Sequence, residues 1–199
     1  TTLKINESAG DVALTIPQIG GGGAAGVSST VEIGNSSTAS ISMGSSVYDF
    51  GTGAVELVGN TTFTAASPTV DSIESVVGGE AQGDGGSFKV TGTVTINNGH
   101  LDINTAGGNI EVTSNIASSG DDESLTLDDG TGTGTVTLGG SATSGSITIV
   151  GNSGVNLTSD LVSTNTASGA INVTGDVTLK GNVTVDADAN NTTVTFNGA

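Results

Sequence analysis

The chain has 199 residues, enough to bury a substantial core in one domain or in two small ones. Three residues are basic and twenty are acidic, so the formal net charge at pH 7 is −17. Because Lys and Arg side chains supply most of the affinity for phosphate groups, we expect no nucleic-acid partner and no attraction to an anionic membrane surface.

Residue usage narrows the fold class further. There is no cysteine, which excludes a disulfide framework and a thiolate metal site. The apolar stretches are broken every few residues by Gly, Ser, Thr or Asn, so no segment is predicted to insert into a membrane. The 33 glycines alternate with short runs in which Val, Ile and Leu occupy every second position. That alternation predicts many short strands and tight turns rather than disorder.

The N-terminal part of the chain has two short alternating stretches, Leu3–Ile5 and Val12–Ile16, followed by the glycine-rich stretch of residues 20–26. We interpret residues 1–25 as an N-terminal cap or as a strand region donated to a neighbour. Residues 26–199 are predicted to form one solenoid, with weak boundaries near residues 26 and 86.

Residues 26–86 form the less regular part of that solenoid. Val31 and Val55 stand 24 residues apart, and Ile41 and Phe63 stand 22 apart, which favours coils of similar length. Ser72–Val77 is expected to form one helical turn, which the glycines after it would end.

Residues 87–199 form the regular part. Successive coils start at apolar residues separated by 24, 22, 24 and 23 positions: Leu101, Leu125, Ile147, Ile171 and Val194. Such a repeat predicts a solenoid, because each coil buries its apolar face on the next one. A left-handed hexapeptide helix would close in roughly 18 residues. The prediction is therefore an all-β, right-handed parallel β-helix with about 22–24 residues per coil.

The segment SGAINVTGDVTLKGNVTVDA, residues 168–187, repeats one three-residue pattern at Ile171, Val177 and Val183. We interpret these as three sides of one coil, with Gly175 and Gly181 at the corners and residues 186–191 as an outward turn. The strand rhythm continues into TVTFNGA at residues 193–199, so we expect either that the chain is a piece of a longer protein or that a neighbouring molecule completes its open solenoid end.

Two longer segments carry a family resemblance: GNIEVTSNIASSGDDESLTLDDGTGTGTVTLGG and GAINVTGDVTLKGNVTVDADANNTTVTFNG. They resemble the β-strand repeats of large bacterial surface and secreted adhesins, the filamentous-haemagglutinin-like and autotransporter-passenger proteins. The resemblance covers residues 86–199 well and residues 1–85 loosely. It implies a right-handed parallel β-helix displayed outside a Gram-negative cell, with an adhesive or matrix role.

An enzyme with this fold would need catalytic side chains on an outward face of the solenoid. The regular coils are predicted to place one column of side chains on such a face: Asp102, Thr126, Thr148, Asn172 and Thr195. One carboxylate at one end of this column does not form an acid–base pair. Lys89 and Glu111 either neighbour Asp102 or form an exposed mixed-charge patch, and His100 is predicted to be a solvated side chain. We therefore expect no catalytic residue and no enzymatic activity.

Acidic turns raise the question of calcium. One cluster is Asp121, Asp122, Glu123, Asp128 and Asp129, and a second is Asp186, Asp188, Asn190 and Asn191. Neither matches the EF-hand spacing or the glycine-rich nonapeptide of calcium-binding β-rolls. We expect no metal and no cofactor, with the acidic turns keeping the rod soluble, while weak calcium binding in the ranges Asp121–Asp129 and Asp186–Asn191 stays an open alternative.

Ice binding requires parallel files of threonine on one flat face. The positions flanking the predicted outward column are His100, Ser124, Ser146, Ala170 and Thr193 on one side and Asn104, Asp128, Val150, Thr174 and Asn197 on the other. Neither set forms a second threonine file. The threonines are better explained by their preference for strands.

Two classes of function follow. The favoured one is an extracellular structural or adhesive β-solenoid, displayed on a cell surface or stacked head to tail into a filament through its open ends. The alternative is a glycan-binding or glycan-cleaving parallel β-helix. Four Phe and one Tyr in the whole chain argue against a sugar-stacking groove, although surface glycans remain candidate partners of the adhesive form.

Overall fold

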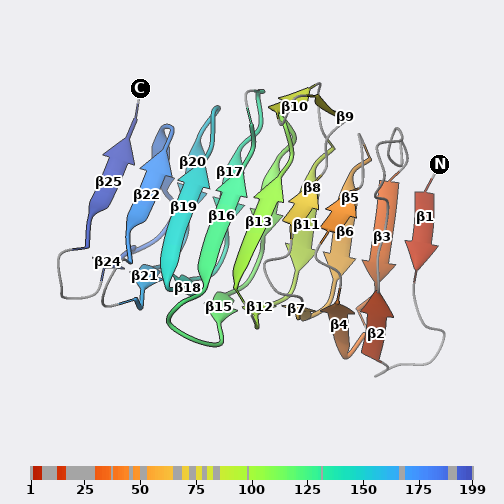
Figure 1. Ribbon diagram of the computed structural model, residues 1–199. Helices are drawn as coiled ribbons and strands as arrows, with labels where there is room; N and C mark the ends of the chain where they lie inside the picture. The colour runs from red at the N-terminus through yellow and green to blue at the C-terminus, as the bar shows by residue number, and fades with distance from the viewer. Residues whose placement is uncertain are drawn as a thin grey trace.

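The computed structural model describes residues 2–5, 13–16, 30–36, 38–44, 47–49, 53–64, 69–71, 75–77, 80–82, 86–97, 99–130, 132–165, 169–187 and 192–198. These residues form strands, turns and bends, and no helix occurs among them. The strands stack along one direction into a β-solenoid, with the two chain ends at opposite ends of the stack (Figure 1).

Three parallel sheets form the sides of the solenoid. Sheet A contains β1 (Thr2–Ile5), β3 (Thr30–Gly34), β6 (Val55–Val58), β11 (Phe88–Thr91), β14 (Ile110–Val112), β17 (Val136–Leu138), β20 (Val155–Leu157) and β23 (Val177–Leu179). Sheet B contains β2 (Ala13–Ile16), β4 (Ser40–Met43), β7 (Thr61–Phe63), β12 (Val94–Ile96), β15 (Ile116–Ser118), β18 (Ala142–Ser144), β21 (Leu161–Ser163) and β24 (Val185–Ala187). Sheet C contains β5 (Val47–Asp49), β8 (Thr69–Asp71), β13 (His100–Asn104), β16 (Ser124–Asp128), β19 (Ser146–Val150), β22 (Ile171–Thr174) and β25 (Val194–Asn197).

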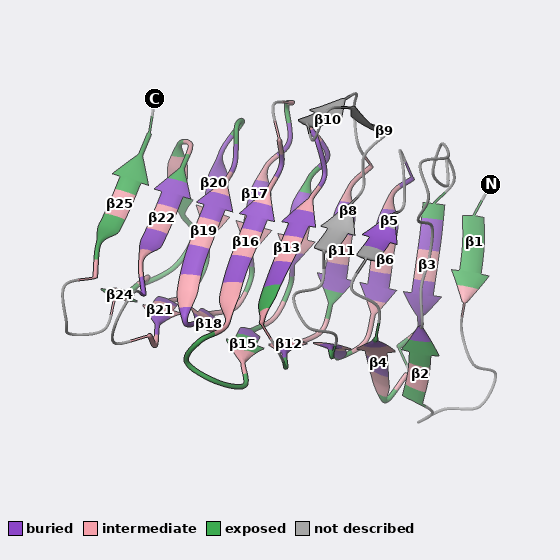
Figure 2. Cartoon of the chain, in the orientation of Figure 1, coloured by how far each residue is buried: buried purple, intermediate pink, exposed green. Residues whose placement is uncertain are grey.

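The alternating pattern of each strand explains why one core fills the space between the sheets. In β16, for example, Leu125 and Leu127 are buried while Ser124, Thr126 and Asp128 face partly outward. The inward side chains of successive coils join into one cluster that extends from Ile16 to Val173 (Figure 2). Burial of this shared apolar surface is the main stabilising term, because a single coil has no core of its own.

The predicted register of sheet C is confirmed. Leu101 pairs with Leu125, Leu125 with Ile147, Ile147 with Ile171, and Ile171 with Val194. The expected parallel β-helix is therefore the fold of the chain.

Coil length varies more in the other two sheets than the sequence interpretation allowed. Thr137 pairs with Asn156, 19 residues later, whereas Asn115 is hydrogen-bonded to the next coil at Ser141, 26 residues later. The corners absorb this variation, because turns can lengthen without shifting the inward side chains of the strands.

Two local predictions about strand positions need correction. Phe63 pairs with Met43, and Ile41 with Thr61, so the register there is two residues shorter than predicted. The third side of the coil in residues 168–187 is β24, which begins at Val185 rather than Val183, although Val183 still packs against the core. The corners at Gly175 and Gly181 lie where predicted, between β22 and β23 and between β23 and β24.

The expected helical turn at Ser72–Val77 is wrong where the structure describes it. β9 (Ser75–Val77) pairs antiparallel with β10 (Glu80–Gln82), and this hairpin leaves the stack between β8 and β11 (Figure 1). Two adjacent β-branched residues, Val76 and Val77, followed by Gly78-Gly79 suit a hairpin better than a helix. The hairpin also explains why Asn60 and Thr93, which occupy equivalent positions in adjacent coils, are 33 residues apart.

Residues 1–25 contribute two described strands. β1 pairs with β3 and β2 with β4, both parallel and in the same sense as the later coils. These strands therefore form two sides of a first coil.

Candidate functional surfaces

The outward face of sheet A carries the charged residues of the first coils in one file. Lys4 lies opposite Glu32, and Lys89 lies between Glu56 and Glu111. Lys4 Nζ is 2.9 Å from Glu32 Oε2, and Lys89 Nζ is 3.9 Å from Glu56 Oε1 and 3.7 Å from Glu111 Oε2. These partly exposed pairs form the mixed-charge patch that the sequence suggested, and each contributes little stability.

The suggestion that Lys89 and Glu111 neighbour Asp102 is wrong. Lys89 and Glu111 belong to sheet A, whereas Asp102 lies on β13 of sheet C, opposite Thr69 and Thr126. The alternating stretches that contain Lys89, Asp102 and Glu111 are strands, as predicted. The three sides of the solenoid, however, place consecutive strands of one coil on different faces.

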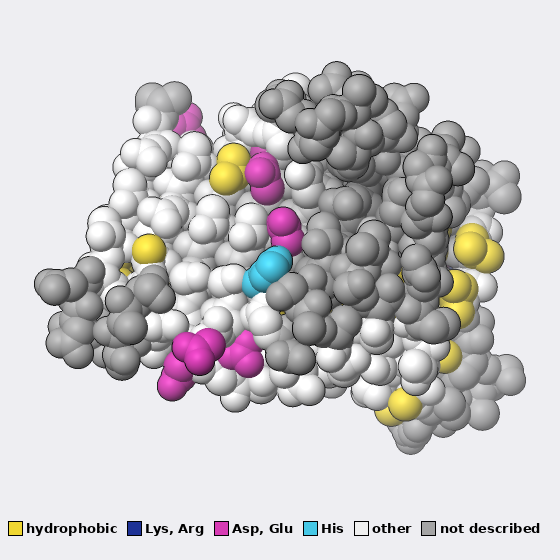
Figure 3. Space-filling view, in the orientation of Figure 1, with side chains coloured by type: hydrophobic (Ala, Val, Ile, Leu, Met, Phe, Trp, Pro, Cys, Tyr) yellow, Lys and Arg dark blue, Asp and Glu magenta, His cyan; other side chains and the backbone are white. Residues whose placement is uncertain are grey.

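The outward face of sheet C has the predicted column. Asp102, Thr126, Thr148, Asn172 and Thr195 lie opposite one another in successive strands. His100 is exposed at the start of β13, on the same strand as Asp102, and Figure 3 shows the histidine on this face beside acidic side chains.

Asp102 also lies diagonally across the ladder from Asp128, because Asp128 pairs with Asn104. Two residues along a strand and one strand spacing across it separate the two Cα atoms by roughly 8 Å. Partial burial raises the pKa of Asp102, His100 opposes this shift, and Asp128 adds to it. Sequence reasoning missed this pair because it followed the column and not its diagonals.

Asp129 occupies the corner between sheets C and A and is completely buried. Its Oδ1 and Oδ2 atoms each accept a 3.0 Å hydrogen bond from the backbone N–H of Asn152 one coil later, and Oδ1 accepts a third from Asn152 Nδ2. Burial raises the pKa of Asp129 to about 6, with the Asn152 hydrogen bonds opposing the shift and Asp128 adding to it. The carboxylate therefore joins the turns of two coils.

The close packing of these turns explains one glycine. Gly130 has φ +71°, and a Cβ at that position would lie 2.6 Å from the Cα of Ala106 in the coil before. Glycine is therefore required both for the left-handed backbone and for the approach of the two turns.

The acidic cluster of residues 121–129 is divided between two corners. β16 separates Asp121, Asp122 and Glu123 at its start from Asp128 and Asp129 at its end. At the first corner Asp122 Oδ1 accepts a 3.3 Å hydrogen bond from Asn165 Nδ2, and Glu123 Oε1 accepts one of 3.2 Å from Ser119. Glu123 Oε2 is buried with no hydrogen-bond partner.

The described part of the chain does not assemble these acids into a metal centre. No group of three His, Cys, Asp or Glu side chains there is arranged to hold a metal ion. In the second acidic segment Asp186 lies exposed on β24, and Asp188, Asn190 and Asn191 lie outside the described residues.

The corner between sheets A and B contains a hydrogen-bonded device that sequence reasoning missed. Asn60 Oδ1 accepts hydrogen bonds from the backbone N–H and the hydroxyl of Thr93, and Asn115 Oδ1 accepts the same two bonds from Ser141. Asp160 Oδ1 accepts a 2.7 Å bond from the N–H of Thr184. Carbonyl-bearing and hydroxyl-bearing side chains thus alternate from coil to coil along one edge, which joins the coils in pairs.

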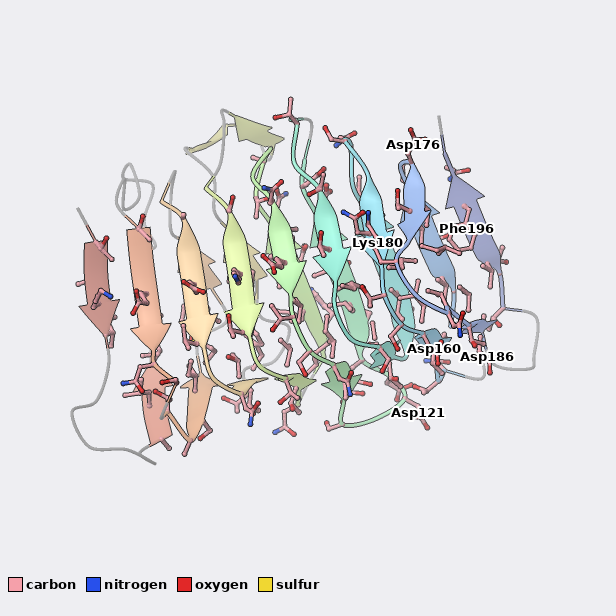
Figure 4. The ribbon with its side chains drawn as sticks, turned by 180° about the vertical axis from the view of Figure 1, so that it is seen from behind. Asp121, Asp160, Asp176, Lys180, Asp186 and Phe196 are labelled. Atoms are coloured by element: carbon pink, nitrogen blue, oxygen red, sulfur yellow. The ribbon has the colours of Figure 1, made fainter. Side chains whose placement is uncertain are left out.

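The coil made of β23, β24 and β25 differs from those before it. Its apolar positions Leu179, Val194 and Phe196 are 60%, 41% and 47% exposed, whereas their partners Leu157, Ile171 and Val173 are at most 1% exposed. Figure 4 shows Phe196 on β25 at this end of the stack, with Asp186 on the same coil. Among the strands that the structure describes, each of these three pairs with one neighbour only.

The remaining aromatic side chains that the structure describes lie in the core. Tyr48, Phe63 and Phe88 are fully buried, and the Tyr48 hydroxyl donates a 2.6 Å hydrogen bond to the backbone oxygen of Ile16. None of the three can stack against a sugar ring at the surface.

Comparison with known proteins adds no relative: no family model, no curated protein and no solved structure matches the chain. Within the described ranges, no helix is long and apolar enough to cross a membrane. The stacked parallel strands define the chain as a repeat protein of the β-solenoid class.

Proposed function

We propose that the chain is an extracellular structural or adhesive element: a stiff β-solenoid that is displayed at a cell surface, or joined end to end, for attachment or matrix formation. The observation that carries the proposal is the continuity of the three parallel ladders over one apolar core. Eight strands at about 4.8 Å spacing make a body roughly 35 Å long in which every coil supports the next.

The surface chemistry supports the same role. Outward positions are mainly small hydroxyl, amide and acidic side chains, with the charged file of sheet A neutralised in part by Lys4 and Lys89. A net charge of −17 keeps such bodies apart side by side. The resemblance to β-repeat adhesins adds a surface location and a bacterial source to the proposal.

Deletion and complementation in the source organism test this role. We expect deletion to reduce attachment or matrix formation, and both the wild-type chain and an Asp102→Asn variant to restore it, because the role needs the rod and no reaction. An unchanged phenotype after deletion would contradict the proposal.

A second candidate, glycan cleavage, rests on Asp102 and Asp128. Glycosidases use two carboxyl groups about 5–9.5 Å apart, one of which has a raised pKa and serves as the acid. Asp102 has a raised pKa, and Asp128 Oδ1 accepts a 2.7 Å hydrogen bond from the Gly130 N–H. Release of reducing ends from a polysaccharide panel by the wild type, with loss in Asp102→Asn and Asp128→Asn, would favour this candidate. Absence of release from every polysaccharide would remove it.

A further inference from the structure

Side chains join the coil β14–β16 to the coil β17–β19 at each corner. Asn109, which precedes β14, accepts two hydrogen bonds at Oδ1 from Thr135, which precedes β17: one of 2.9 Å from the backbone N–H and one of 3.2 Å from the hydroxyl. Asn115 Oδ1 accepts the same pair of bonds from Ser141 between sheets A and B. A side chain of one coil thus holds both the backbone and the side chain of the next.

The other corners of these two coils are joined as well. Between sheets B and C, the Ser144 hydroxyl donates a 3.2 Å hydrogen bond to the backbone oxygen of Glu123. After β16 and β19, Asn152 donates its three hydrogen bonds to the Asp129 carboxylate. Ser144 and Asp129 are completely buried, and a buried polar group that loses its partner destabilises the fold.

The backbones of the two coils approach closely at the same corners. A Cβ at Gly140 would lie 2.5 Å from the carbonyl carbon of Ser114, and a Cβ at Gly145 would collide with the backbone oxygen of Asp121. Glycine permits this approach because it has no side chain at the contact. Gly140 directly precedes Ser141, so the short side chain of Asn115 can reach the Ser141 N–H.

The edge between sheets A and B makes its side-chain bonds at every second interface. Thr93 of the coil β11–β13 bonds back to Asn60, and Asn115 bonds forward to the coil β17–β19. Asp160 of the coil β20–β22 also bonds forward, to Thr184. The interfaces that β14–β16 and β17–β19 share with their outer neighbours therefore use none of these bonds.

The outer interface with the coil β11–β13 has weak side-chain contacts among the described residues. The Asn109 N–H donates a 3.3 Å hydrogen bond to Ser87 Oγ, and Lys89 Nζ lies 3.7 Å from Glu111 Oε2. Both side chains of the ion pair are partly exposed, so the pair contributes little.

The outer interface with the coil β20–β22 has side-chain bonds in sheet A and at the corner between sheets B and C. Asn156 Nδ2 donates a 3.2 Å hydrogen bond to Thr137 Oγ1, and the Ser163 hydroxyl donates one of 2.7 Å to the backbone oxygen of Gly145. Between β14–β16 and β17–β19, by contrast, such bonds occur at each corner.

We propose that the coils β14–β16 and β17–β19 form a clamp that stops local unfolding from spreading along the solenoid. Each coil of a solenoid is coupled to the next through their shared interface, so an opening advances one interface at a time. The opening stops at the strongest interface, which the cross-coil bonds place between β14–β16 and β17–β19. This inference goes beyond the proposed function and does not depend on it.

Hydrogen–deuterium exchange measured by mass spectrometry reports local opening in each coil. We expect the backbone amides of β14–β19 to exchange about tenfold more slowly, or slower still, than those of β11–β13 and β20–β22, after correction for intrinsic rates. Fraying from both ends of the stack would also protect the middle coils. Variants of the corner residues separate the two explanations.

The Asn109→Ala/Asn115→Ala double variant removes the acceptors of four hydrogen bonds. Both side chains are exposed, so their loss leaves no cavity. The ratio of exchange rates between the neighbouring strands and β14–β19 should fall by about tenfold. Asn115→Ala alone should lower this ratio by about threefold, which keeps the test available if the double variant does not fold.

Asn115→Asp is the matched control, because it keeps the acceptor oxygen. Asp160 makes the equivalent bond to Thr184 with a carboxylate, so the Asn115→Asp chain should exchange like the wild type. Circular dichroism checks that each variant keeps the β-fold.

Two results would overturn the inference. Exchange in β14–β19 as fast as in β11–β13 and β20–β22 would show that these coils form no clamp. An unchanged ratio in the folded double variant, or an equal loss in Asn115→Asp and Asn115→Ala, would show that the corner bonds do not cause the protection. Neither result affects the complementation experiment, which tests the proposed structural role separately.

Discussion

At the scale of single residues, Asp129 shows how a polar group can join coils at the cost of sensitivity to pH. Its carboxylate is completely buried, and its hydrogen bonds to Asn152 link consecutive turns. The pKa is raised to about 6, so folding favours the protonated form. The stabilising contribution of this group is complete below the ordinary pKa of 3.8 and is lost as the pH rises through about 6.

The Asp129→Asn variant should therefore lose part of the pH dependence of stability. Between pH 4 and pH 7 we expect the wild type to lose on the order of 1–2 kcal/mol more of its unfolding free energy than the variant does. Urea unfolding at a series of pH values measures this difference. Asp121→Asn serves as the control, because it removes an exposed carboxylate that lies outside the buried turn. Parallel pH profiles for wild type and Asp129→Asn would contradict the assignment.

At the scale of strands and corners, the alternation of Val, Ile and Leu correctly predicted which strand residues face inward and which face outward. This works because one apolar core buries the same face of every strand. The register of sheet C followed from the even spacing of Leu101, Leu125 and Ile147. The assignment of each strand to one of the three sheets did not follow outside the regular column, which is why the sequence left open whether Lys89 neighbours Asp102 or forms an exposed mixed-charge patch. The Asn60 and Asn115 hydrogen bonds were equally inaccessible, because the 33-residue and 26-residue steps hide their equivalence.

Leucines at equivalent positions in adjacent coils should differ sharply in their contribution to stability. Leu157 is fully buried, whereas its partner Leu179 is 60% exposed. Leu157→Ala should lower the unfolding free energy by about 2–5 kcal/mol, and Leu179→Ala by less than about 1 kcal/mol in dilute solution. Chemical denaturation of both variants checks this, and similar losses would mean that the last coil is covered.

The corner device predicts coupling between adjacent coils. Asn115→Ala removes the acceptor of two hydrogen bonds from Ser141 and should cost about 0.5–1.5 kcal/mol. A double-mutant cycle with Ser141→Ala should give a coupling energy above 0.5 kcal/mol, since the two residues act together. Asn182→Ala, at an exposed position in a later corner, is the control. Additive losses for Asn115 and Ser141 would argue against the device.

At the scale of the whole molecule, the chain repeats one structural unit, and few polar side chains of the described residues gather at one site. Three ladders share one core, the acidic residues of positions 121–129 are divided between two corners, and the aromatic rings of the described coils lie inside except Phe196. Such a body supplies length and stiffness, which are the properties of a structural or adhesive element.

The most direct test of this account is the location of the protein on intact cells of the source organism. Antibodies raised against the folded chain should label intact cells, and external protease should remove that labelling. The account predicts equal labelling before and after permeabilisation. Labelling that appears only after permeabilisation would place the protein inside the cell and contradict the proposed role.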